Sequence, residues 1–183
     1  MSEERLLVDQ CKKGDAQAQE RLYAQYSGQM YVICLRYTRS QLEAEDVLQE
    51  SFIKIFDKIN QYKGETAIGG WIKKIVVNTA LNSQRSKLYM FPMTDIEKLK
   101  THQEEELTLS GFQLEELLEM IRSLPEGCQV IFNLYAIEGY THKEIGEQLN
   151  VSEGTSKSQY ARAKQLLKTM INKEERRSYE RAK

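Results

Sequence analysis

Residues 139–168 read GYTHKEIGEQLNVSEGTSKSQYARAKQLLK, and this stretch decides the fold class of the second half of the chain. The segment from His142 to Leu149 has the length of a short helix, and Asn150–Ser152 interrupts it. Ser152 then stands where the N-cap of a longer helix is expected, because its hydroxyl can accept a hydrogen bond from a backbone N–H of the first turn. Two helices joined by so short a break predict a helix-turn-helix.

The second helix of this motif has two different faces when its residues are projected at about 100° each. The inner face holds Ser156, Tyr160, Ala163, Leu167 and Met170, and the outer face holds Lys157, Ser158, Ala161, Arg162 and Gln165. Arginine can bind guanine, serine can donate or accept, alanine can contact a thymine methyl, and lysine can reach a phosphate. The outer face therefore suits a DNA major groove, although the solvated side of an ordinary helical bundle would look similar.

Charge is distributed unevenly along the chain. The net charge of −1 does not mark the whole molecule as a nucleic-acid binder. From Thr155 to the end, however, nine Lys or Arg residues stand against three acids, which favours DNA binding but also fits a solubilising tail. Residues 94–119 have the opposite bias, with eight acids and two lysines.

Composition predicts an all-α protein. The 183 residues include only two prolines and ten glycines, and 29% of them are charged. Apolar periodicity predicts helices near 5–11, 15–37, 41–59, 71–88, 113–123, 126–138, 142–149 and 153–171. We interpret this as two helical domains, 1–93 and 111–183, joined by a flexible acidic linker at 94–110, with the helix-turn-helix in the second domain.

Several functional classes are not expected. Cys11, Cys34 and Cys128 are odd in number and lack a CxxC spacing, which argues against a disulfide framework and a structural zinc site. His102 and His142 are isolated, and no HExxH, GxSxG or P-loop motif is present, so we predict no catalytic residue, metal, cofactor or small-molecule substrate. With no apolar leader or membrane-spanning run, we expect a cytoplasmic protein that is not inserted in a membrane.

A family resemblance appears around the helix-turn-helix. The residues that carry it are Leu124-Pro125, Val130, Phe132, Tyr135, Glu138–Tyr140, Lys143–Gly146, Val151–Ser158 and Ala161–Lys164. This pattern is similar to the −35 reading domain of extracytoplasmic-function sigma factors, which usually have a branched apolar residue where Ser156 stands. The resemblance implies −35 DNA contacts from Thr155, Lys157, Ser158, Ala161, Arg162 and Gln165.

The helix predicted at 41–59 has an apolar face and an outer stripe. The apolar face holds Val47, Leu48, Ser51, Phe52, Ile55, Phe56 and Ile59, and the outer stripe holds Asp46, Gln49, Glu50, Ile53 and Asp57. An isoleucine centred among carboxylates and amides is typical of a protein-docking face, although single exposed isoleucines are common. The segment Glu43–Lys54 resembles the part of sigma factors that binds the clamp helices of RNA polymerase, which implies polymerase contacts from Asp46, Gln49, Glu50, Ile53 and Lys54.

A basic region follows that helix. From Lys54 to Lys87, seven Lys or Arg residues stand against two acids. The helix predicted from Trp71 places Ile72, Ile75, Val76 and Thr79 with Trp71 on one side, and Lys73, Lys74, Val77, Asn78, Leu81, Gln84 and Arg85 on its outer side. The pattern of Tyr62–Glu65 with Trp71 and Asn78 resembles the −10 element and melting region of the same family. It implies that the 61–66 loop captures a flipped base, with DNA contacts from Tyr62, Lys63, Lys73, Lys74, Asn78 and Arg85.

Taken together, the resemblance implies a transcription initiation factor without enzymatic activity of its own. Its implied partners are core RNA polymerase, promoter DNA and an anti-sigma factor. The alternative is a helix-turn-helix repressor whose first domain dimerises or senses a ligand. That alternative leaves the stripe around Ile53 unexplained, and a repressor would be dimeric and would not bind polymerase.

Overall fold

The computed structural model describes the backbone of residues 3–90 and 113–181 and the side chains of residues 3–84 and 113–174. The described residues form helices and turns without a strand, so the all-α prediction is confirmed. The chain divides into two units, Met1–Ser86 and Lys87–Lys183. The predicted linker at 94–110 lies outside the described residues, and the domain limits given above stay predictions.

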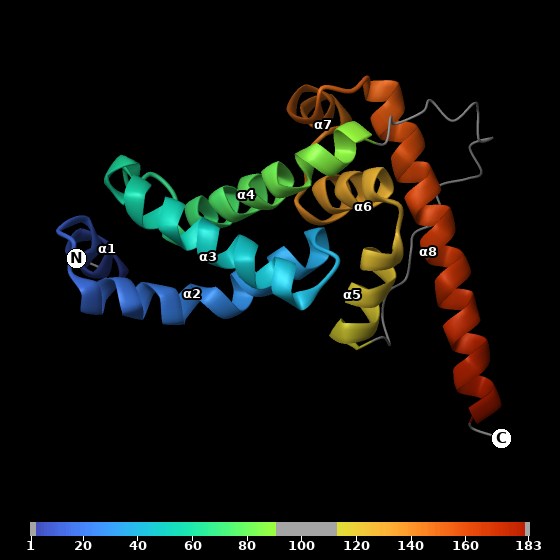
Figure 1. Ribbon diagram of the computed structural model, residues 1–183, viewed down its shortest axis with the longest axis horizontal. Helices are drawn as coiled ribbons and strands as arrows, with labels where there is room; N and C mark the ends of the chain where they lie inside the picture. The colour runs from blue at the N-terminus through green and yellow to red at the C-terminus, as the bar shows by residue number, and fades with distance from the viewer. Residues whose placement is uncertain (1–2, 91–112, 182–183) are drawn as a thin grey trace. The chain divides into compact units, whose positions relative to one another are not determined.

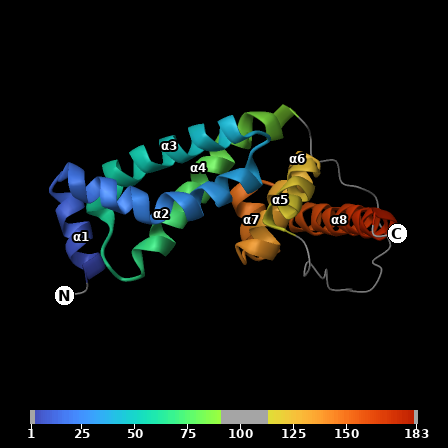
Figure 2. The ribbon, with the colours of Figure 1, turned by 90° about the horizontal axis from the view of Figure 1, so that it is seen from below.

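Unit 1 contains α1 (Glu3–Lys12), α2 (Ala16–Tyr37), α3 (Gln41–Lys58) and most of α4 (Ile68–Met90), with a 3₁₀ turn, η1 (Ile59–Gln61), after α3. The helices α2 and α3 lie side by side (Figures 1 and 2). The short helix α1 packs against both α2 and η1, so the N-terminal residues contact the turn that leads to α4. This contact between distant parts of the chain matters for the site below.

The helix ends of unit 1 follow from capping. The carboxylate of Asp15 accepts hydrogen bonds from the backbone N–H groups of Gln17 and Ala18, at 2.9 and 3.1 Å, and starts α2. The hydroxyl of Ser40 accepts from the N–H of Glu43 at 3.1 Å and starts α3. Each side chain satisfies donors that the helix leaves without an intrahelical partner, which fixes the position of the helix start.

The helix α4 differs from the prediction in extent and in face. It begins at Ile68 rather than Trp71, so Gly69 and Gly70 lie in its first turn and not in the preceding loop. The predicted outer positions Val77, Leu81 and Gln84 are buried, because the packing of unit 1 covers α4 on more than one side. The amide of Gln84, 4% exposed, donates a 2.9 Å hydrogen bond to the carbonyl of Tyr37, which shows how a polar residue is accommodated there.

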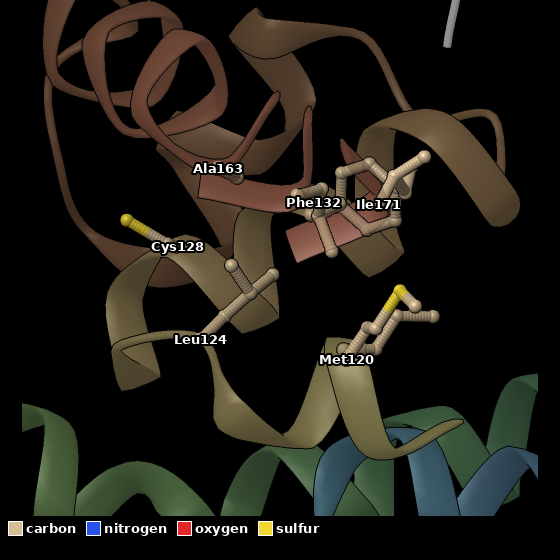
Figure 3. Close-up of a cluster of buried hydrophobic side chains, with 8 residues drawn as sticks. Met120, Leu124, Cys128, Phe132, Ala163 and Ile171 are labelled. Carbon is tan, nitrogen blue, oxygen red and sulfur yellow. The ribbon is translucent and has the colours of Figure 1, made fainter. Parts of the chain in front are cut away.

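Unit 2 contains α5 (Leu114–Ser123), α6 (Glu126–Phe132), a π-helical turn η2 (Asn133–Ile137), α7 (His142–Leu149) and α8 (Glu153–Arg181). The long helix α8 packs against α5, α6 and α7. The core of unit 2 contains apolar side chains from α5, α6, α8 and the turn after α5. They are Met120, Ile121, Leu124, Cys128, Phe132, Ala163, Leu167 and Ile171 (Figure 3). The inner face predicted for the second helix of the motif is confirmed by the burial of Ser156, Ala163 and Leu167.

Among the described residues, no helix combines the length and the apolar character needed to cross a membrane.

Candidate functional site

The turn between α7 and α8 has the geometry of a helix-turn-helix. Asn150 adopts a left-handed conformation, with φ of 56° and ψ of 48°, and its N–H donates to the carbonyl of Gly146. A Cβ on Gly146 would lie 2.8 Å from the carbonyl oxygen of Val151, so only glycine allows the chain to pass this close. The turn is therefore set by two residues within five positions of each other.

Capping interactions fix the helices on either side of this turn. Glu144 accepts from the N–H of Thr141 at 2.8 Å while the Thr141 hydroxyl accepts from the N–H of Glu144 at 3.2 Å, which forms a capping box for α7. The Glu144 carboxylate also accepts from the Thr141 hydroxyl at 2.7 Å. The hydrogen bond from the Thr141 N–H first, and then this one, hold the pKa of Glu144 below its ordinary value. The hydroxyl of Ser152 accepts from the N–H of Thr155 at 2.9 Å, as the N-cap prediction requires.

The outer face of α8 is accessible along its first turns. Lys157, Arg162 and Gln165 are exposed, and Ser158 and Ala161 are half-buried. Lys157 forms a 2.7 Å ion pair with Glu153 one turn earlier; both side chains are exposed, so little energy is needed to separate them. Thr155 departs from this pattern: it is only 5% exposed, and its hydroxyl lies 2.8 Å from that of Ser152, within the cap.

Aromatic rings pack between η2, α7 and α8 beneath this face. The ring of Tyr135 stacks on His142 with centroids 4.1 Å apart and meets Tyr160 at 4.5 Å. The Nδ1 atom of His142 lies 2.9 Å from the hydroxyl of the fully buried Ser156, so this buried serine has a polar partner. Burial first, and then the nearby charge of Lys157, lowers the pKa of His142.

The stripe on α3 is exposed as predicted. Ile53 is 63% exposed, and Asp46, Gln49 and Glu50 around it are exposed as well. Lys54, at the edge of the stripe, is half-buried and forms a 2.6 Å ion pair with Glu50. The opposite side of the helix, including Phe52 and Ile55, is buried in unit 1. An aliphatic side chain surrounded by acids and amides is therefore held out on a rigid, well-capped helix, which suits contact with another protein.

The 61–66 loop and the start of α4 form the third candidate surface. Tyr62 is half-buried, and its ring lies 5.6 Å from that of Trp71, while Lys63 is exposed. On α4, Lys74 and Asn78 are exposed and Lys73 is half-buried. The side chain of Arg85 lies outside the described residues. The structure brings the rings of Tyr62 and Trp71 together, and basic or polar side chains are exposed on the same loop and helix. Aromatic rings with basic side chains suit single-stranded nucleic acid.

Sequence reasoning missed the contribution of α1 to this third surface. The ammonium group of Lys12 donates a 2.9 Å hydrogen bond to the backbone carbonyl of Tyr62, fifty residues away. The hydroxyl of Tyr26 donates to Glu4 at 2.8 Å; burial first, and then this hydrogen bond, raises the pKa of Tyr26 to about 12. Helical periodicity cannot reveal such contacts, because it relates only residues close together on one helix.

The three cysteines lie in the interior of the two units. All three cysteines are free and buried, and burial raises the pKa of Cys34 to about 12. Cys128 donates to the buried Gln159 at 3.0 Å, which gives it a packing role. No group of three or more His, Cys, Asp or Glu side chains in the described part of the chain could hold a metal ion.

Comparison with protein families matches both units. Residues 22–88 match the family model described as "Sigma-70 region 2", and residues 114–167 match "Sigma-70, region 4". The "ECF RNA polymerase sigma-E factor" of Haemophilus influenzae is 29% identical over 177 residues, covering 90% of this chain and 93% of that protein. The protein of the same name from Escherichia coli K12 is 27% identical over 180 residues, covering 92% and 94%.

Solved structures show the same fold at low identity. The sigma factor RpoE of Bartonella quintana, solved in complex with the anti-sigma factor NepR, gives a TM-score of 0.53 at 14% identity over 84% of this chain and 96% of that one. CnrH, solved in complex with the cytosolic domain of CnrY, gives a TM-score of 0.50 at 16% identity over 92% and 97%. The outer face of α8, the stripe on α3, and the 61–66 loop with the start of α4 lie within the residues that the two family models match, whereas α1 precedes them.

Proposed function

Because the chain belongs to the sigma-70 family of RNA polymerase initiation factors, in its extracytoplasmic-function group, we propose that its three exposed surfaces divide the work of initiation. A member of this family binds core RNA polymerase and directs promoter recognition and DNA opening. One observation supports this assignment of separate roles: unit 2 displays a helix-turn-helix face, and unit 1 displays an acidic stripe centred on an exposed isoleucine.

The α3 stripe is the polymerase-binding surface in this proposal. Ile53 supplies the apolar anchor, and Asp46, Gln49 and Glu50 supply polar contacts at its edge, as in interfaces whose energy is concentrated in a few residues. Lys54 orients the carboxylate of Glu50 through their ion pair. Since these side chains do not support the core of unit 1, changing them should affect docking rather than folding.

The outer face of α8 reads the −35 element. Arg162 and Gln165 reach base edges, Ala161 and Ser158 lie close to the groove, and Lys157 leaves Glu153 to bind a phosphate. Thr155 supports this face indirectly, because its buried hydroxyl contacts the Ser152 cap at the start of α8 and is not directed at DNA. The sequence predicted a DNA contact from Thr155, and we propose instead that Thr155 stabilises the start of α8.

The 61–66 loop and α4 open the −10 element. A base flipped from the duplex stacks near Tyr62, while Lys63, Lys74 and Asn78 hold the displaced strand and Lys73 supports them. The polymerase performs the chemistry, and this chain supplies recognition and strand opening. Its place of work is accordingly that of the polymerase, in the cytoplasm.

An anti-sigma factor is the proposed regulator. Both structural relatives named above were solved with a bound partner, and the partner of RpoE is the anti-sigma factor NepR. A partner that covers the Ile53 stripe or the α8 face would block polymerase or promoter binding by direct competition.

Reconstitution with core RNA polymerase tests the proposal. A promoter is first selected from random duplex DNA by the reconstituted holoenzyme, and run-off transcription from it is then measured with wild type, Ile53→Asp/Asp46→Lys and the control Asn60→Asp. Asn60 is exposed in the η1 turn, beyond the C-terminal end of α3. We expect the double variant to bind polymerase at least about 30-fold more weakly, because a hot-spot change costs about 2 kcal/mol or more. Its circular-dichroism spectrum should be unchanged.

The outcome that contradicts this division is equally clear. Wild-type polymerase affinity in the double variant would show that the stripe is not the docking face. A wild-type chain that elutes as a dimer from size-exclusion chromatography and ignores core polymerase would favour the repressor alternative.

A further inference from the structure

The loop proposed to capture a base is held at its first end by helix α1 and at its second end by Tyr26 of α2, which is itself hydrogen-bonded to α1. This helix precedes residue 22, where the region 2 family match begins, so the match assigns it no role. One side of α1 packs into unit 1, because Val8 and Cys11 are buried there, with 3% and 1% of their surface exposed. Figure 1 shows α1 beside the start of α2, and α1 also contacts η1.

The first end of the loop is fixed by Lys12 in the last turn of α1. Its ammonium group donates to the carbonyl of Tyr62 at 2.9 Å and lies 5.9 Å from the centroid of the Tyr62 ring. The hydroxyl of Tyr62 in turn donates to the carbonyl of Thr66, which ties the two sides of the loop together. A hydrogen bond from a charged donor is among the stronger single contacts available to a loop backbone.

The second end is fixed through Tyr26. Its hydroxyl donates to Glu4 of α1 at 2.8 Å, and the edge of its ring lies 3.0 Å from where a Cβ on Gly69 would stand. The glycine therefore lets the first turn of α4 rest directly on Tyr26. Helix α1 thus contacts Tyr62, where the loop begins, directly, and it reaches Gly69, just after the loop, through Tyr26 of α2.

Between these ends the loop is open. Lys63, Glu65, Thr66 and Ala67 are exposed, and Gly64 adopts a φ of 77°, which turns the chain back. An exposed loop of this kind loses conformational freedom when it binds a ligand, and constraining it beforehand lowers that cost. Besides the Tyr62–Thr66 hydrogen bond within the loop, the constraint comes from outside it, because the exposed residues themselves contribute little burial.

We propose that Lys12 is a positioning residue for base capture, holding the Tyr62–Thr66 loop in its binding conformation through the Tyr62 carbonyl. The inference rests on the proposed −10 role of this loop. Lys12 acts on the backbone of Tyr62 and not on the DNA. The loss of DNA opening when Lys12 is replaced should therefore depend on the identity of the captured base more than on salt concentration.

The test uses full-length protein reconstituted with core polymerase on the selected promoter. Lys12→Met removes the donor and keeps the aliphatic stem, Lys12→Arg restores a charged donor, and Lys13→Met removes the same charge from a neighbouring exposed position. Trp71 is the only tryptophan of the chain and its ring lies 5.6 Å from that of Tyr62, so its emission in the free protein reports on the loop.

We expect Lys12→Met to change the Trp71 emission, to slow DNA opening about tenfold and to reduce the preference for the captured base by a similar factor, as loss of one charge-assisted hydrogen bond implies. Lys12→Arg should restore all three, and Lys13→Met should match wild type. Polymerase binding should be unchanged in every variant, because the Ile53 stripe is untouched.

Two results would overturn the inference while leaving the loop's role intact. One is unchanged emission and unchanged base preference in Lys12→Met, alongside a clear loss of base preference in Tyr62→Ala. The other is a uniform loss on all promoter sequences with a smaller salt slope, which would make Lys12 a phosphate contact. If Tyr62→Ala and Lys63→Ala also leave opening and preference unchanged, the −10 assignment fails and the inference fails with it.

Discussion

The two surfaces proposed to contact DNA are built in different ways. The helix-turn-helix of unit 2 is closed by neighbours in sequence: Thr141 with Glu144, Gly146 with Val151, and Ser152 with Thr155. The loop of unit 1 is held by Lys12, fifty residues away in sequence. Where the contacts are local, the sequence of the motif determines the geometry of the surface. Where a distant helix holds the surface, its geometry depends on how the whole unit is packed.

The largest effect should come from breaking the local closure at Gly146. Gly146→Val would place a Cβ 2.8 Å from the carbonyl oxygen of Val151, and a backbone atom cannot move aside as a side chain can. We expect unit 2 to lose about 3 kcal/mol of unfolding free energy, at the upper end of overpacking costs, together with −35 binding. The measurement is urea unfolding followed by circular dichroism, with Trp71 fluorescence reporting unit 1 separately.

The control for that change is Gly154→Val, also in a helix, where the nearest neighbouring atom to an added Cβ is the Ser152 hydroxyl at an ordinary 3.6 Å. It should destabilise unit 2 much less. An equal loss in both variants, or a Trp71 transition that shifts together with the circular-dichroism transition, would contradict the local character of the turn.

The next effect concerns how each surface recognises DNA. Arg162 is exposed on the outer face of α8, where a guanidinium can bind guanine through two hydrogen bonds. We expect Arg162→Ala to lower affinity for the selected −35 sequence by about 1 to 3 kcal/mol and to relax the preference at one base pair. Binding is measured with variants of the −35 site at constant salt, and full wild-type binding would refute α8 as the reader.

Lys74→Ala on α4 provides the contrasting case. Lys74 is exposed on the third surface and is proposed to hold backbone, not base. Its removal should weaken open-complex formation alike on all sequences and lower the salt slope by about one. If Arg162→Ala behaves in this same uniform way, then Arg162 also binds phosphate and the base readout belongs to other residues of α8.

Much of the fold, and less of the site, could be predicted from the sequence. Helical spacing correctly separated the buried Ser156 and Leu167 from the exposed Arg162, because one side of α8 packs in the core. The same reasoning was wrong for Val77, Leu81 and Gln84 of α4, because a helix covered on several sides has no single buried stripe. The contact of Lys12 with Tyr62 was not predictable, since it depends on where the packing of unit 1 places α1.

A smaller effect tests the distant closure at Gly69. An added Cβ there meets only the edge of the Tyr26 ring, at 3.0 Å, and the ring can shift by a few tenths of an ångström. Because alanine also favours the helix by about 1 kcal/mol, Gly69→Ala should change the unfolding free energy of unit 1 by less than that amount while altering Trp71 emission.

Gly70→Ala is the matched control, since an added Cβ there has no neighbouring atom within 4 Å. It should stabilise α4 slightly and leave the Trp71 emission as in wild type. If both alanine variants stabilise unit 1 equally and neither alters the emission, Tyr26 does not constrain the start of α4.

The smallest expected effect is a pH dependence confined to unit 2. His142 is stacked on Tyr135, bonded to Ser156, and faced by Lys157 and Glu153 of α8; burial and then Lys157 hold its pKa below the ordinary 6.5. The unfolded chain therefore binds a proton more readily, so the unfolding free energy should fall as pH decreases from 6.5 through the lower folded pKa.

His142→Gln, which retains a polar partner for Ser156 without titrating there, should lose less stability between pH 7.5 and 5.5 than wild type, as measured by urea unfolding. The carboxylate of Glu153 has its pKa lowered by its hydrogen bond to Lys157, and so titrates below this window. Equal losses in the two proteins would show that the proton taken up on unfolding does not belong to His142, and His102→Gln serves as the control for the other histidine of the chain.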